Sequence, residues 1–215
     1  HGADIINLSL GGDEDDPIFH QAIKSATQQG MIIIGAAGNS GAGTVTYPAQ
    51  YSEVIGVGAT NTDGTRAAYS NYGSALTLVA PGGDTGLDLN NDGQPDGIPS
   101  QTCATPACTS FATVYLSGTS QAASEVSAVA ALLESCGAAP VNIRTLLTAS
   151  ARDLGPAGRD DQFGSGQVDA AAALTAAGCV AAVPASPGSA VWSATERFVA
   201  GAVASIDKMC VRGDV

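Results

Sequence analysis

The chain has 215 residues, the size of one domain with a short extension. Its residues are 45% hydrophobic, which allows a sizeable core, and 20 acidic against 8 basic side chains give a net charge of −12. A chain this acidic lacks the basic surface that binds nucleic-acid phosphates, and no apolar run reaches the length of a membrane span. We therefore predict neither a nucleic-acid partner nor a membrane partner.

Short apolar runs in the first 80 residues predict buried strands, and a helix lies between the first two. The helix is expected from Pro17 to Gln29, with Asp15 or Asp16 as its N-cap. The strands are expected at Ile5–Leu10, Met31–Ala36, Val54–Ala59 and Leu76–Ala80. This order predicts a parallel α/β sheet, whose functional groups gather at the carboxyl ends of its strands.

The second half begins with a polar segment rich in Gly, Asp, Asn and Pro. Gly83–Ser110 has neither a strand period nor a helix period and is predicted to be a long inserted surface loop. Helices are then expected at Gln121–Ser135, Asn142–Ala149 and Asp169–Ala176, followed by an Ala/Pro/Ser linker and an amphipathic helix at Thr195–Cys210.

The five cysteines favour an oxidising, extracellular setting. Cys103 and Cys108 flank a four-residue loop, which favours a local disulfide, and Cys136 and Cys179 each end a predicted helix and are candidates for a second pair. Cys210 is then left over. None of them has the spacing of a zinc site, and free buried thiols remain the alternative to disulfides.

A serine and an asparagine are the strongest candidates for chemistry. Gly118-Thr119-Ser120 forms a Gly-bounded turn that opens a helix, whose N-terminal N–H groups can stabilise an oxyanion. Asn39 follows a neighbouring strand and offers a neutral amide donor at the same sheet edge. Taken alone, Thr119 or Ser120 could be a helix N-cap and Asn39 a turn residue.

Several segments in a fixed order resemble the subtilisin-like serine proteases (subtilases). They cover about residues 2–178 except the loop near 83–110, and the ordered set is far more specific than any one motif. The matching segments are Ala3–Gly12, Ala36–Asn39, Tyr47–Ala49, Ser70–Gly73, Ala80–Gly82, Gly118–Ala122 and Phe163–Ala170. The resemblance implies a three-layer, doubly wound parallel sheet with helices on both faces, and a secreted endopeptidase acting on peptide or protein substrates.

The resemblance also assigns roles to single residues. Ser120 would be the nucleophile, and the Asn39 amide would hold the oxyanion together with the Ser120 backbone N–H. The expected substrate-binding residues are Ser9, Leu10, Gly11, Ala37, Gly38, Thr46, Gly118 and Thr119. Among these, Thr46 stands where family members often have Gly at the floor of the primary specificity pocket, so it would disfavour large aromatic P1 residues.

The acid and base that would complete the triad are not expected in this chain. Subtilases order the triad as Asp, His and Ser, and both partners would lie upstream of Ser120. His1 and His20 lack the family's His-Gly-Thr-His context and are predicted to be structural or surface residues. Ser124 and Glu125 replace the family's usual Pro and His after the serine motif. Because His1 almost adjoins a buried strand, we expect a missing N-terminal part of the same catalytic domain to be the partner of residues 1–178. Residues 179–215 would be a linker and extension.

The inserted loop contains a candidate calcium site. Hard oxygen donors at relative positions one, three, five, seven and nine, with Gly93 at position six, match the first part of an EF-hand-like loop. The candidate ligands are Asp88, Asn90, Asp92, the carbonyl of Gln94, and Asp96. Position twelve is Pro99, so the usual bidentate Glu is absent, and a flexible acidic loop is the alternative. Subtilases commonly use calcium to stabilise surface loops, which supports calcium as a cofactor.

Three functions remain for the whole chain at this stage. The first is an endopeptidase whose base lies upstream. The second is a pseudoprotease or peptide-binding module that keeps the substrate groove without catalysis. The third, a nucleotide-binding α/β domain, is disfavoured because no Gly-rich phosphate loop follows a strand.

Overall fold

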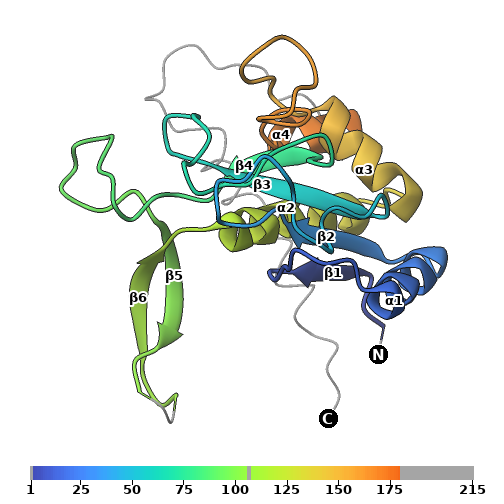
Figure 1. The fold of residues 1–215 in the computed structure, drawn as a ribbon, viewed down its shortest axis with the longest axis horizontal. Coiled ribbons are helices and arrows are strands. Elements are labelled where there is room, and N and C mark those ends of the chain that lie inside the picture. The colour runs from blue at the N-terminus through green and yellow to red at the C-terminus, as the bar shows by residue number, and fades with distance from the viewer. Residues whose placement is uncertain (1, 106–107, 180–215) are drawn as a thin grey trace.

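The structure, a computed structural model, describes residues 2–105 and 108–179 (Figure 1). It contains a central parallel sheet, a separate two-stranded sheet and four helices among these residues. In chain order the elements are β1 (Ile5–Leu8), α1 (Pro17–Gln28), β2 (Ile32–Ala36), β3 (Val54–Thr60), β4 (Leu78–Pro81), β5 (Ile98–Cys103), β6 (Phe111–Leu116), α2 (Thr119–Ser135), α3 (Pro140–Ala149) and α4 (Ala170–Ala176). The predicted linker and helix beyond residue 180 lie outside the described residues.

The central sheet has the order β1-β2-β3-β4, and all three pairings are parallel. Every residue of β2 and β3 is buried. This confirms the prediction, made from their continuous apolar runs, that both strands are covered on both faces. β1 differs because it forms the edge of the sheet and none of its four residues is fully buried.

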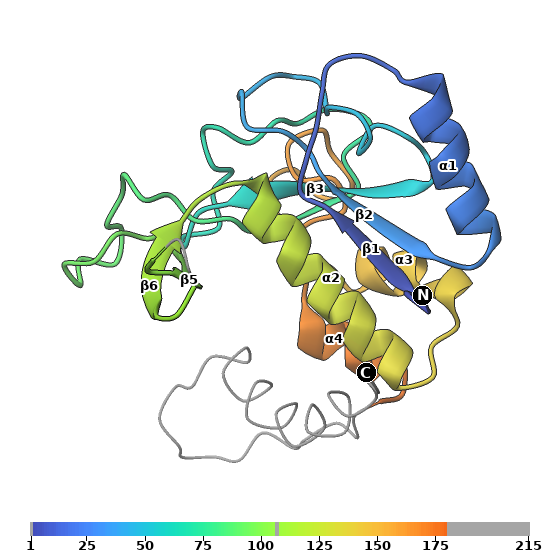
Figure 2. The same cartoon turned by 90° about the horizontal axis from the view of Figure 1, so that it is seen from below.

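Helices cover both faces of this sheet, and successive residues of one strand point to opposite faces (Figure 2). Ile32 and Ile34 of β2 join the core cluster that contains residues of α2, α3 and α4. Ile33, between them, packs with Ile23 of α1 and with Tyr51 on the other face. Among the described residues, no helix combines the length and the apolar character that a membrane crossing requires.

Helix starts follow the predicted chemistry with small shifts. Asp16 caps α1, since its Oδ1 accepts the backbone N–H groups of Ile18 and Phe19 at 2.9 and 3.1 Å. α2 begins at Thr119, two residues before the predicted start, and α3 begins at Pro140, also two residues earlier. The strand predicted to reach Leu10 ends at Leu8, so residues 9–11 continue beyond the paired part of the sheet.

The prediction that Gly83–Ser110 is one loop without strands was wrong. β5 lies within that range and pairs with β6 in an antiparallel hairpin that projects from the sheet domain (Figure 1). The pairing register runs from Ile98↔Leu116 at the base to Cys103↔Phe111 near the tip. β5 has Pro99 and mostly polar residues, so it carries no strand pattern of its own and forms because β6 supplies its hydrogen-bond partners.

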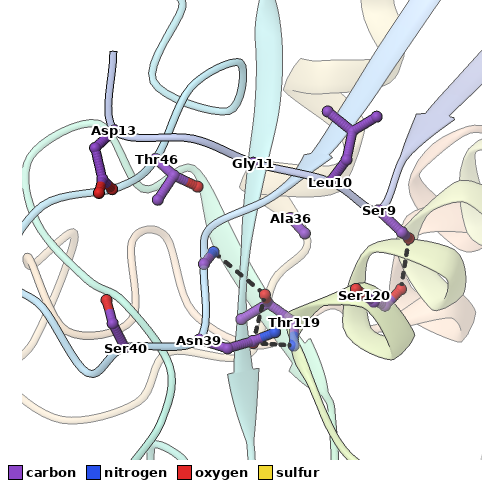
Figure 3. A pocket seen from close by; sticks show the side chains of 11 residues that line it. Ser9, Leu10, Gly11, Asp13, Ala36, Asn39, Ser40, Thr46, Thr119 and Ser120 are labelled. Atoms are coloured by element: carbon purple, nitrogen blue, oxygen red, sulfur yellow. Dashed lines mark hydrogen bonds between the residues drawn. The ribbon is translucent and has the colours of Figure 1, made fainter.

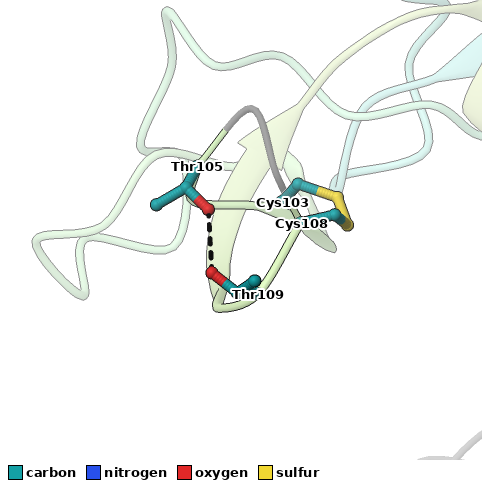
Figure 4. Close-up of a disulfide and its surroundings, with 4 residues drawn as sticks. All are labelled: Cys103, Thr105, Cys108 and Thr109. Atoms are coloured by element: carbon teal, nitrogen blue, oxygen red, sulfur yellow. Dashed lines mark hydrogen bonds between the residues drawn. A yellow bond between two sulfur atoms is a disulfide. The ribbon is translucent and has the colours of Figure 1, made fainter.

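A disulfide joins Cys103 to Cys108 at the tip of this hairpin, as predicted (Figure 4). The hydroxyls of Thr105 and Thr109 lie 3.4 Å apart across the same turn. The disulfide and this hydroxyl contact both join residues that are close in sequence, so the conformation of the hairpin tip is stabilised within the tip itself.

The segment 163–168 fastens the C-terminal helices to the sheet. The backbone N–H groups of Val79 and Val168 donate to Gly166 O and Val79 O respectively, both at 2.9 Å. Gly164 has φ +60, and a Cβ there would meet the Thr77 carbonyl, so only glycine allows this close approach. The segment therefore runs beside β4 and brings α4 onto the core.

Candidate active site

A cavity of about 320 Å³ opens at the carboxyl ends of β1 and β2, beside the first turn of α2 (Figure 3). Both candidate chemical residues, Ser120 and Asn39, line it. The lining residues are Ser9, Leu10, Gly11, Asp13, Ala36, Gly38, Asn39, Ser40, Thr46, Thr119 and Ser120. The parallel topology thus brings together three segments that are far apart in the sequence.

The orientation of the Asn39 amide is set by Thr119. Asn39 Oδ1 accepts the Thr119 backbone N–H at 2.9 Å and its hydroxyl at 2.8 Å, and Thr119 Oγ1 in turn accepts the Gly38 N–H at 3.2 Å (Figure 3). A backbone N–H can only donate, so the atom facing it must be the amide oxygen. The Asn39 NH₂ group is therefore left free to donate elsewhere.

Ser120 sits in the first turn of α2, where helix N–H groups have no intrahelical acceptor. The Thr119 N–H is already satisfied by Asn39, whereas the Ser120 N–H lies beside it at the same helix end. Gly118 precedes them with φ +156, and a Cβ there would lie 3.5 Å from Asn39 Nδ2 and 2.9 Å from Gln121 Oε1. Glycine therefore keeps the approach to the serine and the amide open.

A buried asparagine holds the loop that carries Asn39. Asn71 is 1% exposed, and its Oδ1 accepts the Ser40 N–H, the Ser40 hydroxyl and the Ala42 N–H at 2.9, 2.9 and 3.1 Å. The adjacent Ser70 hydroxyl accepts the Ala59 N–H at 2.9 Å. These buried polar groups are satisfied, so they make the loop after β2 rigid.

Thr46 fills the space between two glycines of the cavity wall. A Cβ on Gly11 would collide with Thr46 Oγ1, and a Cβ on Gly38 would come within 2.9 Å of Thr46 Cγ2. The Thr46 hydroxyl donates to Ala37 O at 3.2 Å, which directs its methyl group away from that bond. A side chain at this position therefore occupies cavity volume that glycine would leave empty.

Comparison with known proteins decides the family. A sequence model of the Subtilase family matches residues 1–166. The chain belongs to the subtilase family. It is 37% identical over 175 residues to M-protease from Shouchella clausii and 36% identical over 175 residues to the minor extracellular protease Epr from Bacillus subtilis. A solved protease structure from Pseudoalteromonas arctica superimposes with a TM-score of 0.71 at 37% identity.

These matches cover most of this subtilase but only part of its relatives. They take in 80% of this chain against 40% of M-protease and 24% of Epr, and 81% of this chain against 51% of the Pseudoalteromonas structure. The chain therefore spans about half or less of the length of each relative named here.

The cavity of this subtilase includes residues that sequence reasoning did not select. Ala36, Asp13 and Ser40 line it, and Asp13 brings a carboxylate to its rim. Ala36 lies within a segment that matches the family, and Asp13 and Ser40 each directly follow such a segment. Ala37 lies just behind the wall, fully buried, with its carbonyl accepting the Thr46 N–H at 2.9 Å.

The histidine that the structure describes is engaged elsewhere. His20 Nε2 lies 3.1 Å from Glu53 Oε2, and its ring stacks on Tyr51 with centroids 3.7 Å apart. It does not line the cavity that Ser120 lines. The other candidate, His1, lies outside the described residues.

Glu125 is a carboxylate on α2 that the sequence had marked only as a departure from the family pattern. It lies five residues after Ser120 and is only partly exposed. Burial raises the pKa of Glu125 to about 7. Its charge state therefore changes in the neutral pH range.

The calcium candidates lie together in one turn of the inserted segment. Asp88 accepts the N–H groups of Asp92 and Gly93, both at 3.1 Å, and Asn90 Nδ2 donates to Asp92 Oδ2 at 3.1 Å. Asp96 is 5% exposed and its Oδ2 accepts the Leu89 N–H at 2.5 Å. In the described part of the chain, no three Asp, Glu, His or Cys side chains are grouped to hold a metal ion.

Proposed function

We propose that this chain is the C-terminal majority of the catalytic domain of a serine endopeptidase, with Ser120 as nucleophile and Asn39 as oxyanion donor. One observation carries the proposal. The Asn39 amide oxygen accepts both the backbone N–H and the hydroxyl of Thr119, which leaves the amide NH₂ as a donor on the cavity that Ser120 also lines.

In the proposed reaction, Ser120 Oγ attacks the scissile carbonyl of a bound peptide. The carbonyl oxygen becomes an oxyanion, which accepts hydrogen bonds from Asn39 Nδ2 and the Ser120 N–H. Collapse of this intermediate breaks the C–N bond, and the amine leaves with the proton that the base took from Ser120. The acyl-enzyme on Ser120 is then hydrolysed by water. Both donors are held before the substrate arrives, so they need little reorganisation when charge develops.

The base that takes the Ser120 proton, and the acid that orients it, would come from an upstream part of the same catalytic domain. The free edge of β1 supports this arrangement, because β1 has no partner on its outer side among the described residues and an unpaired strand edge can pair with further strands. Additional strands there would extend the sheet toward the doubly wound, three-layer arrangement of the family. Residues 179–215 would lie beyond this domain.

The substrate would lie along Ser9, Leu10 and Gly11, which extend beyond β1 with part of their backbone unpaired, as a peptide strand requires. Thr46, between Gly11 and Gly38, would shorten the P1 pocket and favour small P1 side chains. A peptide library varied at P1 tests this assignment. A clear preference for Phe over Ala would refute it.

Calcium is proposed as a structural cofactor of the inserted segment. Asp88, Asn90 and Asp92 supply hard oxygen donors within one turn, in which Asn90 Oδ1 accepts the Asp92 N–H and Asp92 Oδ1 accepts the Gln94 N–H, and the Gln94 carbonyl would add a further oxygen. Asp96 supports the turn through the Leu89 N–H and would complete the set from the same loop. The ion would supply positive charge that holds these carboxylates together, with no part in peptide hydrolysis.

An extracellular location is proposed on two grounds. The Cys103–Cys108 disulfide is typical of oxidising compartments. In addition, one relative is named as an extracellular protease.

Fluorophosphonate labelling of the complete encoded protein tests the catalytic proposal. We expect covalent labelling at Ser120, loss of labelling in Ser120→Ala, and no labelling of the 215-residue chain alone. A folded complete protein that binds peptides but is never labelled would favour the alternative function, a pseudoprotease that keeps the substrate groove.

A further inference from the structure

Two thiols meet at the far end of the molecule, where the C-termini of two packed helices come together. Cys136 is the C-cap of α2, and Cys179 follows the end of α4. Figure 2 shows α4 alongside the C-terminal half of α2. Leu133 of α2 and Leu174 of α4 belong to the same buried cluster, and Cys179 packs against that cluster.

The two cysteine side chains are neighbours at these helix ends. Both are free thiols, and Cys136 lies close enough to Cys179 to contribute to the raised pKa of its thiol. The backbone on each side is held by helix-end hydrogen bonds, with Cys136 N–H donating to Leu132 O and Leu133 O at 3.2 Å and Cys179 N–H donating to Leu174 O at 2.8 Å. The side chains therefore meet because two ordered helix ends are anchored to one core.

We propose that Cys136 and Cys179 form a second disulfide, which locks the C-terminal helices α3 and α4 onto α2. The sequence separation of Cys136 and Cys179 is 43 (179 − 136) and spans both α3 and α4, whereas the separation of Cys103 and Cys108 is only 5. A cross-link over a longer loop removes more conformational freedom from the unfolded chain. The Cys136–Cys179 disulfide would therefore stabilise the domain more than the Cys103–Cys108 disulfide does.

The oxidant is a disulfide of another molecule, such as a low-molecular-weight disulfide or an oxidoreductase. Cys136, the exposed thiol, attacks one sulfur of the oxidant as thiolate and releases the first thiolate, which takes up a proton. The Cys179 sulfur then attacks the Cys136 sulfur of the mixed disulfide and expels the second thiolate. Two electrons and two protons pass to the oxidant, which leaves as two thiols.

The environment of Cys179 favours the cross-linked form once it exists. Burial, followed by the hydrogen bond to Cys136, raises the pKa of the Cys179 thiol to about 11. An external thiol that attacks the Cys136 sulfur would have to expel Cys179 as a high-pKa leaving group, which is slow. We therefore expect this bond to be reduced more slowly than the exposed Cys103–Cys108 bond at the hairpin tip.

Peptide mapping of the complete protein after incubation with oxidised glutathione tests the proposal. The expected result is a Cys136 peptide linked to a Cys179 peptide, two hydrogens lighter than the two free peptides together. Alkylation of both thiols after the incubation would overturn the proposal, as would a link from either of them to Cys210.

Thermal unfolding provides the second measurement. The variants Cys136→Ser, Cys179→Ser and the double variant should each lower the Tm of the oxidised protein by the same amount, on the order of 10 °C, because either one removes the link. The matched control Cys103→Ser/Cys108→Ser should leave the Cys136–Cys179 peptide intact. Single variants with clearly different, additive effects would contradict a shared bond.

Discussion

The region around Ser120, at the carboxyl ends of the parallel strands, and the inserted segment 84–116 are stabilised by different kinds of contact. At the sheet edge, residues from three distant segments hold one another through buried contacts, as Asn71 does for the loop of Asn39. In the inserted segment, most side-chain bonds span two to seven residues and most residues are exposed. The positions of the side chains around Ser120 therefore depend on the packing of the whole domain. The conformation of the inserted segment depends on its own turns, its disulfide and a proposed ion.

The largest expected effect tests whether the sheet edge is catalytic. Asn39→Ala in the complete protein should lower kcat by about 10²–10³-fold, a magnitude known from subtilisin itself that we adopt here. Steady-state kinetics on a peptide substrate measures it. Asn39→Asp keeps the acceptor for Thr119 but loses the donor, and it should be at least as inactive. A rise in KM alone, with kcat preserved, would remove Asn39 from the oxyanion role.

A pair of glycine substitutions compares the two regions directly. Gly38→Ala at the sheet edge places a Cβ 2.5 Å from Asn71 Nδ2 at φ +108, and we expect it to lower the free energy of unfolding by roughly 3–4 kcal/mol. Gly93→Ala in the insert has φ +82 but no atom within 4 Å of the new Cβ, so only about 1 kcal/mol of backbone strain is expected. Urea unfolding of both variants gives the two values. Equal losses would show that the regions do not differ in packing.

Glu125 tests how strongly burial on α2 affects the stability of the sheet region. Its pKa is raised to about 7 in the folded state, so the folded protein binds this proton more tightly than the unfolded chain does. This binding contributes fully to the free energy of unfolding below the ordinary pKa of 4.5, and the contribution is lost as pH rises through about 7. Glu125→Gln cannot ionise and should be more stable than the parent by roughly 2–3 kcal/mol at pH 8. At pH 4 the difference should vanish. Unfolding curves across this range that run parallel would mean that the carboxyl is well solvated.

The smallest effect concerns the insert. Removing calcium with a chelator should lower the stability of the complete protein by about 1–2 kcal/mol, which corresponds to a few degrees in Tm. Asp92→Asn should abolish the response to added calcium, whereas Asp63→Asn, in a turn outside the insert, should retain it. Calcium titrations followed by thermal unfolding measure both. A parent protein with the same Tm in chelator and in excess calcium would rule out the proposed ion.

Sequence patterns predicted the sheet region better than the insert for a physical reason. Continuous apolar runs such as Ile32–Ala36 can only be stable when buried, so they identified β2 and β3 within one residue at each end. β5 was missed because its strand character comes from pairing with β6, which the residues of Ile98–Cys103 do not encode alone. The Cys103–Cys108 disulfide was predictable because its loop is too short to allow many other geometries.

The amino-acid order alone was sufficient to recognise the family, the parallel sheet and the pairing of Ser120 with Asn39 as candidates, because these depend on local motifs and on burial. Only folding in three dimensions determined which atom of the Asn39 amide faces the cavity and that Thr46 lies between two glycines. Each of these is a contact between side chains far apart in the chain. Such contacts follow from how the helices and strands pack, which a linear pattern does not specify.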